Sequence, residues 1–341
     1  MAPPLPEVTL APSAEARGKD EPRGRRERGM AERRTIYLPV MIAVAVAVAC
    51  SAALLALSGE KARAAFPGKN GKIAYFDRSE SGGNDIYSMK ADGTDRKRLT
   101  EDTANDYAPD VSPNGKKIAF ASSRSGANKI YVMKADGTAV RNLSGSEVGE
   151  SGPAWSPDGR RIAFERDGDV WVMDADGSNR KNLTDTPPVN GYEVRENDPA
   201  YSPDGTKIAF HKETFRPHDV DLYTISPDGK QLRQVTDFPG KEYSPDWSPS
   251  GNRLAYVRST RASGERVTTI RPDGTDKQFI AQDGYSPTWS PDGRRIAFDR
   301  NGDLYKAKSD GSGEPGVVVG GPAESSEFAP DWGPRRASTA R

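Results

Sequence analysis

Short alternations of apolar and polar residues, separated by turn signals, run along the chain from residue 66 onward without a helical period. Residues 153–184 give the clearest example. A short apolar segment and a turn precede Arg161 to Arg166, which alternates as a half-buried strand does. Val170 to Met173 is too apolar throughout to face water, and Arg180 to Thr184 follows an Asp-Gly turn. This pattern predicts four antiparallel strands of four to six residues each.

The same unit recurs six times, with its first-turn glycines 42 to 46 residues apart, at Gly71, Gly115, Gly159, Gly205, Gly251 and Gly293. A second turn ending in Asp-Gly is present in every unit and supplies the positive φ that tight hairpins need. Short strands repeated at this period are typical of a radial β-repeat. We therefore predict an all-β fold over residues 66–334, a six-bladed β-propeller of four-stranded antiparallel blades.

The first repeat lacks the opening Pro-x-Trp strand that the other repeats carry in some form. An isolated copy of that strand stands near the C-terminus, at residues 329–334. We expect this C-terminal strand to pair into the first repeat and close the ring, because a closed ring hides its strand edges. Residues 335–341 are expected to be a disordered tail.

The N-terminal region has the pattern of an export signal. Residues 1–35 are basic and without periodicity, so we expect disorder, and residues 36–57 are almost wholly apolar. Ala62-Arg63-Ala64 is an acceptable cleavage site. Two alternatives stay open: a cleaved signal peptide, or a hydrophobic helix that anchors the chain. Either places the propeller at the cell envelope, on the periplasmic or extracellular side, with Met1 or Met30 as the start.

The charge and cysteine content of the chain restrict the classes of partner that we expect. From Ala65 onward, 39 basic residues face 42 acidic ones, which argues against general nucleic-acid binding. The single cysteine, Cys50, lies outside the predicted propeller, so no disulfide is expected there. We expect a monomer that needs no cofactor and that touches a membrane only through residues 36–57, if they are not cleaved off.

Residues 153–184 resemble the repeat of the TolB β-propeller family, and the resemblance covers essentially all of 66–334. It implies a non-catalytic periplasmic propeller that works with the Tol–Pal envelope system and binds proteins at its channel mouth. The N-terminal α/β domain of TolB is not expected here, because the repeats start directly after the signal. Similar repeats occur in dipeptidyl-peptidase-type enzymes, but no hydrolase domain is expected after residue 334 and no Gly-x-Ser-x-Gly motif is present.

Acidic residues recur three places before the strand-opening proline, at Asp106, Glu150, Glu196, Glu242 and Glu327, while Gly284, next to Asp283, is the exception. They are predicted just before the innermost strand, circling one mouth of the channel. Like charges arranged in this way focus a negative potential that would attract a cation or a basic peptide segment. The alternative is structural: each acid caps a turn or pairs with a nearby Arg or Lys.

Two less regular segments on the same face, residues 185–198 and 211–219, are predicted to be recognition loops. Their candidate binding residues are Tyr192, Arg195, Phe215, Arg216 and His218. The alternative interpretation is a pair of solvated loops. His211 and His218 could hold zinc together with Asp219, although no metal site is predicted.

These observations favour an exported, non-catalytic scaffold that binds a protein partner. The alternative is an extracytoplasmic lyase or hydrolase that acts on glycan or peptide at the channel mouth. Metal-dependent lyases with related repeats gather several histidines at the channel, whereas this chain has two. Glycan binding through Trp155, Tyr201, Trp247, Trp289 and Trp332 is a third possibility, but their repeat position predicts that they pack between blades.

Overall fold

The computed structural model describes residues 67–78, 83–145, 148–189, 191–215, 218–320 and 329–335. Every regular element within those ranges is a β-strand. No helix among these residues is long and apolar enough to cross a bilayer. The chain divides into two compact units, residues 1–60 and 61–341, and all described residues belong to the second. The segments predicted at 1–35 and 36–57 therefore lie outside the described residues.

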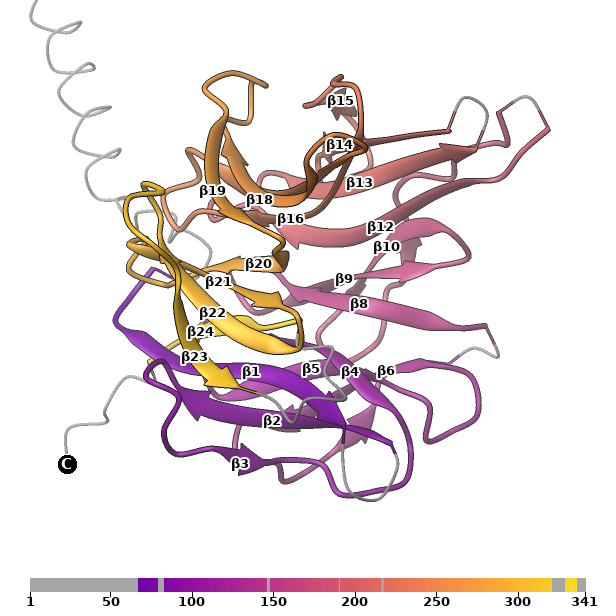
Figure 1. Cartoon of the computed structure of the whole chain (residues 1–341). Helices are drawn as coiled ribbons and strands as arrows, with labels where there is room; N and C mark the ends of the chain where they lie inside the picture. The colour runs from indigo at the N-terminus through magenta and orange to yellow at the C-terminus, as the bar shows by residue number, and fades with distance from the viewer. Residues whose placement is uncertain are drawn as a thin grey trace, which may run out of the picture. The chain divides into compact units, whose positions relative to one another are not determined.

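The first three repeats each build one antiparallel sheet of four strands (Figure 1). The first repeat holds β1 (Asn70–Arg78), β2 (Asn84–Lys90) and β3 (Lys97–Arg98), joined by β24 (Asp331–Pro334). The second comprises β4 (Asp106–Val111), β5 (Lys117–Ser122), β6 (Lys129–Lys134) and β7 (Arg141–Asn142). The third comprises β8 (Glu150–Trp155), β9 (Arg161–Arg166), β10 (Asp169–Asp174) and β11 (Lys181–Asn182).

The fourth and fifth repeats share one eight-stranded sheet, because a single parallel bridge between Val220 and Lys241 joins them. The fourth comprises β12 (Val194–Tyr201), β13 (Ile208–Phe215), β14 (His218–Ile225) and β15 (Arg233–Gln234). The fifth comprises β16 (Lys241–Trp247), β17 (Leu254–Thr260), β18 (Gly264–Ile270) and β19 (Gln278–Gln282). The sixth repeat comprises β20 (Tyr285–Trp289), β21 (Arg295–Arg300), β22 (Asp303–Lys308) and β23 (Gly316–Gly320).

The last strand returns to the first repeat. β24 pairs antiparallel with β1, placing Trp332 opposite Ile73, and in Figure 1 the yellow β24 lies close to the indigo β1. The first strands of consecutive repeats also touch in order, from β4 through β8, β12, β16 and β20 to β24. Contacts between β24 and β4 complete this sequence.

A separate apolar cluster fills each junction between neighbouring repeats. Trp155, for example, packs against Ala119 and Val132 of the preceding repeat. Five of the six clusters contain the aromatic residue of the Pro-x-Trp segment: Trp155, Tyr201, Trp247, Trp289 or Trp332. These residues are 2% to 7% exposed, so their predicted packing between repeats is confirmed. The sixth cluster has Val111 at this position.

Strand lengths differ from the prediction in two respects. The fourth strands of the first four repeats are only two residues long. In the fourth repeat, the segment 211–219 predicted as a loop is mostly strand, and the segment 185–198 is strand from Val194 onward, because β12, β13 and β14 extend to eight residues each. The run from His211 to Phe215 has polar residues on both faces, so it lacks the alternation that marks a strand. Backbone pairing extends this hairpin beyond the apolar core.

Candidate functional site

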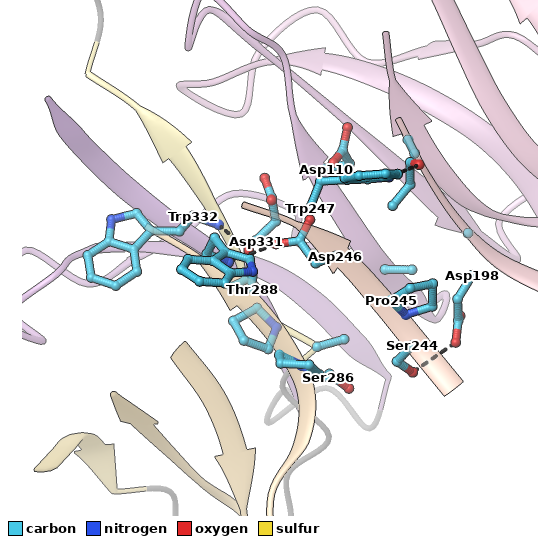
Figure 2. A pocket seen from close by; sticks show the side chains of 18 of the residues that line it. Asp110, Asp198, Ser244, Pro245, Asp246, Trp247, Ser286, Thr288, Asp331 and Trp332 are labelled. Atoms are coloured by element: carbon cyan, nitrogen blue, oxygen red, sulfur yellow. Dashed lines mark hydrogen bonds between the residues drawn. The ribbon is translucent and has the colours of Figure 1, made fainter. Parts of the chain in front are cut away.

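A narrow pocket of about 190 Å³ lies where the first strands of the repeats meet (Figure 2). Its lining comes from six strands, β4, β8, β12, β16, β20 and β24, with Ala329 and Pro330 just before β24, and Pro249 and Pro291 just after β16 and β20. Five strands contribute a Pro-x-aromatic segment, and the second repeat contributes Pro109 and Asp110. A volume this small is below the range of about 300–1,000 Å³ that is usual for small-molecule sites.

A repeated backbone distortion shapes the pocket wall. In each repeat the residue before the strand-opening proline has a positive φ, between 26° and 55°: Ala108, Gly152, Asp198, Ser244, Ser286 and Ala329. In β4, β8, β12, β16 and β20 the pairing register shifts at this point. A bulge of this kind bends the strand and re-aims the side chains that follow it.

The residue after the proline links neighbouring repeats when its side chain can accept a hydrogen bond. Asp110 accepts the backbone N–H of Trp155, and Asp246 accepts that of Trp289, each at 2.7 Å. Asp331 on β24 accepts the N–H of Val111, also at 2.7 Å. Thr288 Oγ1 lies 3.4 Å from the nitrogen of Trp332. Ala154 and Ala200 occupy the same position and cannot make this bond. We call the four accepting side chains the inter-repeat latches.

Three of the latches are carboxylates in one confined space, and Figure 2 shows them grouped at one end of the pocket. Burial raises the pKa of Asp246 to about 7. Burial, with the nearby Asp246 charge, also raises the pKa of Asp331 to about 7. The pKa of Asp110 is raised well above its usual range, first by burial and then by the charge of Asp331. Ionising all three together is therefore unfavourable near neutral pH.

A second polar cluster joins the third, fourth and fifth repeats. Asp198 Oδ2 lies 3.3 Å from His211 Nδ1 and accepts a hydrogen bond from Ser244 Oγ at 2.8 Å. The Asp198 backbone N–H donates to Glu165 at 2.7 Å. Burial opposes protonation of His211, but the hydrogen bond and charge of Asp198 outweigh it and raise the His211 pKa. Burial and Asp198 together raise the pKa of Glu165.

A family model described as the TolB β-propeller domain matches residues 51–191 and 169–336. The chain belongs to the TolB β-propeller family. Within this propeller domain, the structure describes the repeats, the aromatic residues between them and the pocket where their first strands meet. No curated protein matches the chain at a significant level.

Solved structures share the propeller fold at low identity. TolB from Acinetobacter baumannii is 20% identical, with a TM-score of 0.66 over 78% of this chain and 67% of that one. A chain of the nidogen–laminin complex is 15% identical, with a TM-score of 0.64 over 78% of this chain and 100% of that one. Hydrazine synthase from Kuenenia stuttgartiensis is 17% identical, with a TM-score of 0.62 over 80% and 48%. Such identities establish the fold alone.

The acidic residues predicted around the propeller mouth are buried and paired with bases. Asp106 and Glu150 begin β4 and β8, while Glu196 and Glu242 lie inside β12 and β16, so these four do not precede the strands as predicted. All four are 0% to 1% exposed. Their partners, at 2.6 to 3.3 Å, are Arg124, Arg180, Lys212 and Arg258 respectively. This pairing matches the structural alternative. Glu327 lies outside the described residues.

Burial also perturbs these acids. It raises the pKa of Asp106 and Glu196 despite their basic partners. Burial, followed by the charge of Asp221, raises the pKa of Glu242 to about 8. Asp283, beside the exceptional Gly284, is exposed. The four buried acids therefore lie in the interior of the protein, where their basic partners compensate much of their charge.

The structure brings three of the predicted recognition residues together at the extended hairpin of the fourth repeat. The guanidinium of Arg195 lies 5.3 Å from the centre of the Phe215 ring. Phe215 stacks on His218 with ring centres 6.0 Å apart. Tyr192, 37% exposed, lies in a preceding turn that is closed by backbone bonds to Val189. We call Tyr192, Arg195, Phe215 and His218 the hairpin patch. Arg216 lies outside the described residues.

The two histidines do not form a joint metal site. His211 contacts Asp198, whereas His218 Nε2 lies 3.0 Å from Glu213. His218 is opposite Phe215, four residues along β13 from His211, so the two histidines are about 13 Å apart at the usual rise of a strand. Asp219 is opposite Thr214, on the other face from His218. Within the described ranges, no group of three His, Cys, Asp or Glu side chains could hold a metal ion.

Sequence reasoning missed the inter-repeat latches. They occupy the variable position of Pro-x-Trp, which is Asp in three repeats and Thr in one. A signal was available: an acid recurring between a proline and a core aromatic is unusual in a strand that must be buried. The hydrogen bond to the next repeat depends on the bulge, which no periodicity in the sequence indicates.

Proposed function

We propose that this chain is an exported, six-bladed TolB-like propeller that binds a protein partner at the cell envelope without catalysing a reaction. The hairpin patch is the observation that carries the proposal. It places the exposed Arg195 and His218 against the half-buried Phe215 ring, at the turn end of a hairpin whose two strands have eight residues each. Aromatic residues and arginine are enriched where proteins bind one another.

The six-bladed closed ring is part of this proposal. It is supported by the pairing of β24 with β1 and by the latch from Asp331 to Val111, which connects the C-terminal strand to the second repeat. A closed ring provides a rigid frame for recognition at its rim. Deletion of residues 328–341 is expected to lower the melting temperature of the whole propeller. An unchanged melting temperature would contradict closure.

The proposed docking surface runs from the hairpin patch toward the propeller mouth, where Asp106, Glu150, Glu196 and Glu242 are buried beside their basic partners. Glu327, predicted with them, lies outside the described residues. A basic partner segment would compete there for carboxylates that now pair with Arg and Lys. Breaking a buried ion pair with Arg or Lys costs free energy. This cost favours a partner that makes a small number of well-placed contacts over one held by electrostatic attraction alone.

The absence of catalysis is supported by the geometry of the Asp198 cluster. Ser244 Oγ donates to Asp198, and His211 also contacts Asp198. A nucleophile–base pair needs the hydroxyl to donate to the imidazole. The serine here donates its hydrogen to the carboxylate, so the cluster functions as a structural link between the fourth and fifth repeats.

Crosslinking in intact envelopes, followed by capture of the full chain, tests partner binding. Phe215→Ala is expected to abolish the crosslinked species. The matched control is Phe279→Ala, because Phe279 is 52% exposed and lies under Arg266 at 5.5 Å in the same cation–ring arrangement. Equal crosslinking by wild type and both variants would reject the hairpin patch as the docking surface.

Export is tested separately by the mature N-terminus. A terminus at Ala65 would indicate a cleaved signal, and a terminus at Met1 or Met30 would indicate an anchor. In both cases the propeller should be accessible to protease added outside the cytoplasmic membrane. Protection of the propeller in spheroplasts would contradict export.

A further inference from the structure

One junction of the propeller lacks the aromatic residue that fills the other five. Where the first and second repeats meet, Val111 occupies the position of Trp155 and Tyr201. A second reduction in size faces it. The residue opposite the recurring alanine of the neighbouring strand is Ser88 in the first repeat, whereas it is Val132 and Val172 in the next two and Thr224 and Thr269 in the fourth and fifth.

These two small residues lie in a cavity of about 610 Å³ between the first and second repeats. Its deep wall is formed by Ala74, Ser88, Val111 and Ile118. The corresponding hollow at the junction of the third and fourth repeats has a similar volume, about 690 Å³, but Tyr201 lines it and the counterparts of Ala74 and Ser88 do not reach it, so the two hollows differ in their walls. The volume falls within the range of about 300–1,000 Å³ that is typical of small-molecule sites.

The deep wall carries an unused hydrogen-bonding group. Ser88 is 3% exposed, and its Oγ has no hydrogen-bond partner within the described part of the protein. Burying a hydroxyl without a partner is unfavourable, and such groups are normally satisfied. This hydroxyl is itself covered by the wall, so a ligand in the cavity would reach it only after a small shift of the neighbouring side chains.

The rim is cationic. Lys72, Lys90, Lys97 and Arg335 line the cavity, with Asp136 as the single acidic lining residue. Lys72 is paired with Asp95 at 3.0 Å, and Lys97 donates to the Asp136 carbonyl oxygen at 2.6 Å. Lys90 and Arg335 are exposed at the entrance. The charge therefore favours an anion, and the apolar wall favours a flat hydrophobic body.

We propose that this cavity is a binding site for a small aromatic carboxylate. The ring would lie against Val111 and Ile118, in the space that an indole or phenol fills at the other junctions, and the carboxylate would contact Lys90 and Arg335. The chain's own residues 336–341 follow Arg335 directly, but they contain two arginines and no aromatic residue. Their composition fits neither the apolar wall nor the cationic rim.

The test measures binding of indole-3-carboxylate to the full chain by calorimetry or saturation-transfer NMR. Indole and acetate are the matched controls. Saturable binding of indole-3-carboxylate is expected, tighter than that of either control. Lys90→Glu should weaken it at least about tenfold, the loss of one charge-assisted contact. The control is Lys134→Glu, because Lys134 is the equivalent exposed residue of the second repeat and lies outside this cavity.

Two further variants fill the cavity. Val111→Trp restores the side chain found at the other junctions, and Ser88→Val restores that of the second and third repeats. Both should abolish binding, and Ser88→Val keeps the test valid if the larger substitution prevents folding. Three results would overturn the proposal: no binding to the wild type, equal binding by both filled variants, or binding only after residues 336–341 are deleted. The last would mean that the tail occupies the cavity.

Discussion

The aromatic residue on the C-terminal strand is the sharpest test of how the propeller holds its last repeat. Trp332 is 3% exposed and packs against Ile73 and Met89 of the first repeat and Leu304 of the sixth. It therefore contacts both ends of the repeat series at once. We predict that Trp332→Ala loosens the C-terminal strand as well as the local core.

The magnitude follows from burial. Truncating a buried tryptophan to alanine costs about 3–5 kcal/mol, because the transfer free energy is lost and a cavity remains. For a domain of this size, each kcal/mol lowers the melting temperature by about 2–4 °C, which gives a decrease of roughly 6–20 °C. Trp247→Ala provides the matched control, since Trp247 is also 3% exposed but lies between the fourth and fifth repeats, inside the chain.

Calorimetry and hydrogen exchange on the full chain in mild detergent separate the two effects. Both variants should melt earlier by similar amounts. Only Trp332→Ala should accelerate exchange in β1, because only that variant weakens the pairing of β24 with β1. A decrease of less than 2 °C for Trp332→Ala, or equal exchange of β1 in both variants, would refute the reasoning.

Three further predictions concern charge and backbone. The folded pKa of Asp246 is about 7 and lies above its unfolded value of about 3.9, so the protein should lose stability as pH rises from 4 through 7. Asp246→Asn should reduce the difference in melting temperature between pH 5 and pH 8, and an unchanged difference would contradict this. Arg180→Ala removes the closest basic partner of the buried Glu150, which keeps a hydrogen bond from Ser144 Oγ and a 3.9 Å contact to Arg166, and should cost about 3 kcal/mol in urea unfolding. The exposed pair Arg161–Asp174 provides the comparison, because Arg161→Ala should cost less than about 1 kcal/mol. Gly152→Ala should cost about 1–3 kcal/mol in the same assay, since φ is +55° and the new Cβ would lie 2.6 Å from Glu165 Oε1. Gly191→Ala, at φ +79° with open space around it, should cost less, and equal losses would refute the close-contact argument.

The regular parts of the fold were predictable because they depend on local chemistry. The alternation at Arg161 to Arg166 predicts β9 to the residue, and the Asp-Gly turns place the hairpins. The aromatic positions were predictable for the same reason, since a large side chain recurring in a short strand needs a neighbour to cover it. The pairing of β24 with β1 follows from the isolated copy of the Pro-x-Trp segment.

The candidate site was less predictable because its features depend on distant parts of the chain. The acids at Glu150 and Glu242 have a visible spacing, but their burial and basic partners come from other strands. The latch at Asp110 needs the bulge at Ala108 and the backbone of the next repeat. The hairpin of the fourth repeat extends by backbone pairing that the alternation of side chains does not specify.

The bridge between Val220 and Lys241 has a mechanical consequence. It ties the part of β14 near the hairpin turn to the fifth repeat by backbone pairing. The described strands of the third repeat do not pair with those of the fourth, although the Glu196 backbone N–H donates to the Gly168 carbonyl oxygen. A partner that pulls on Phe215 would load two repeats in parallel. Force applied at this residue in single-molecule pulling should therefore release the fourth and fifth repeats in one step of about 90 residues, a span set by two repeat periods. Two separate steps would show that the bridge does not transmit force.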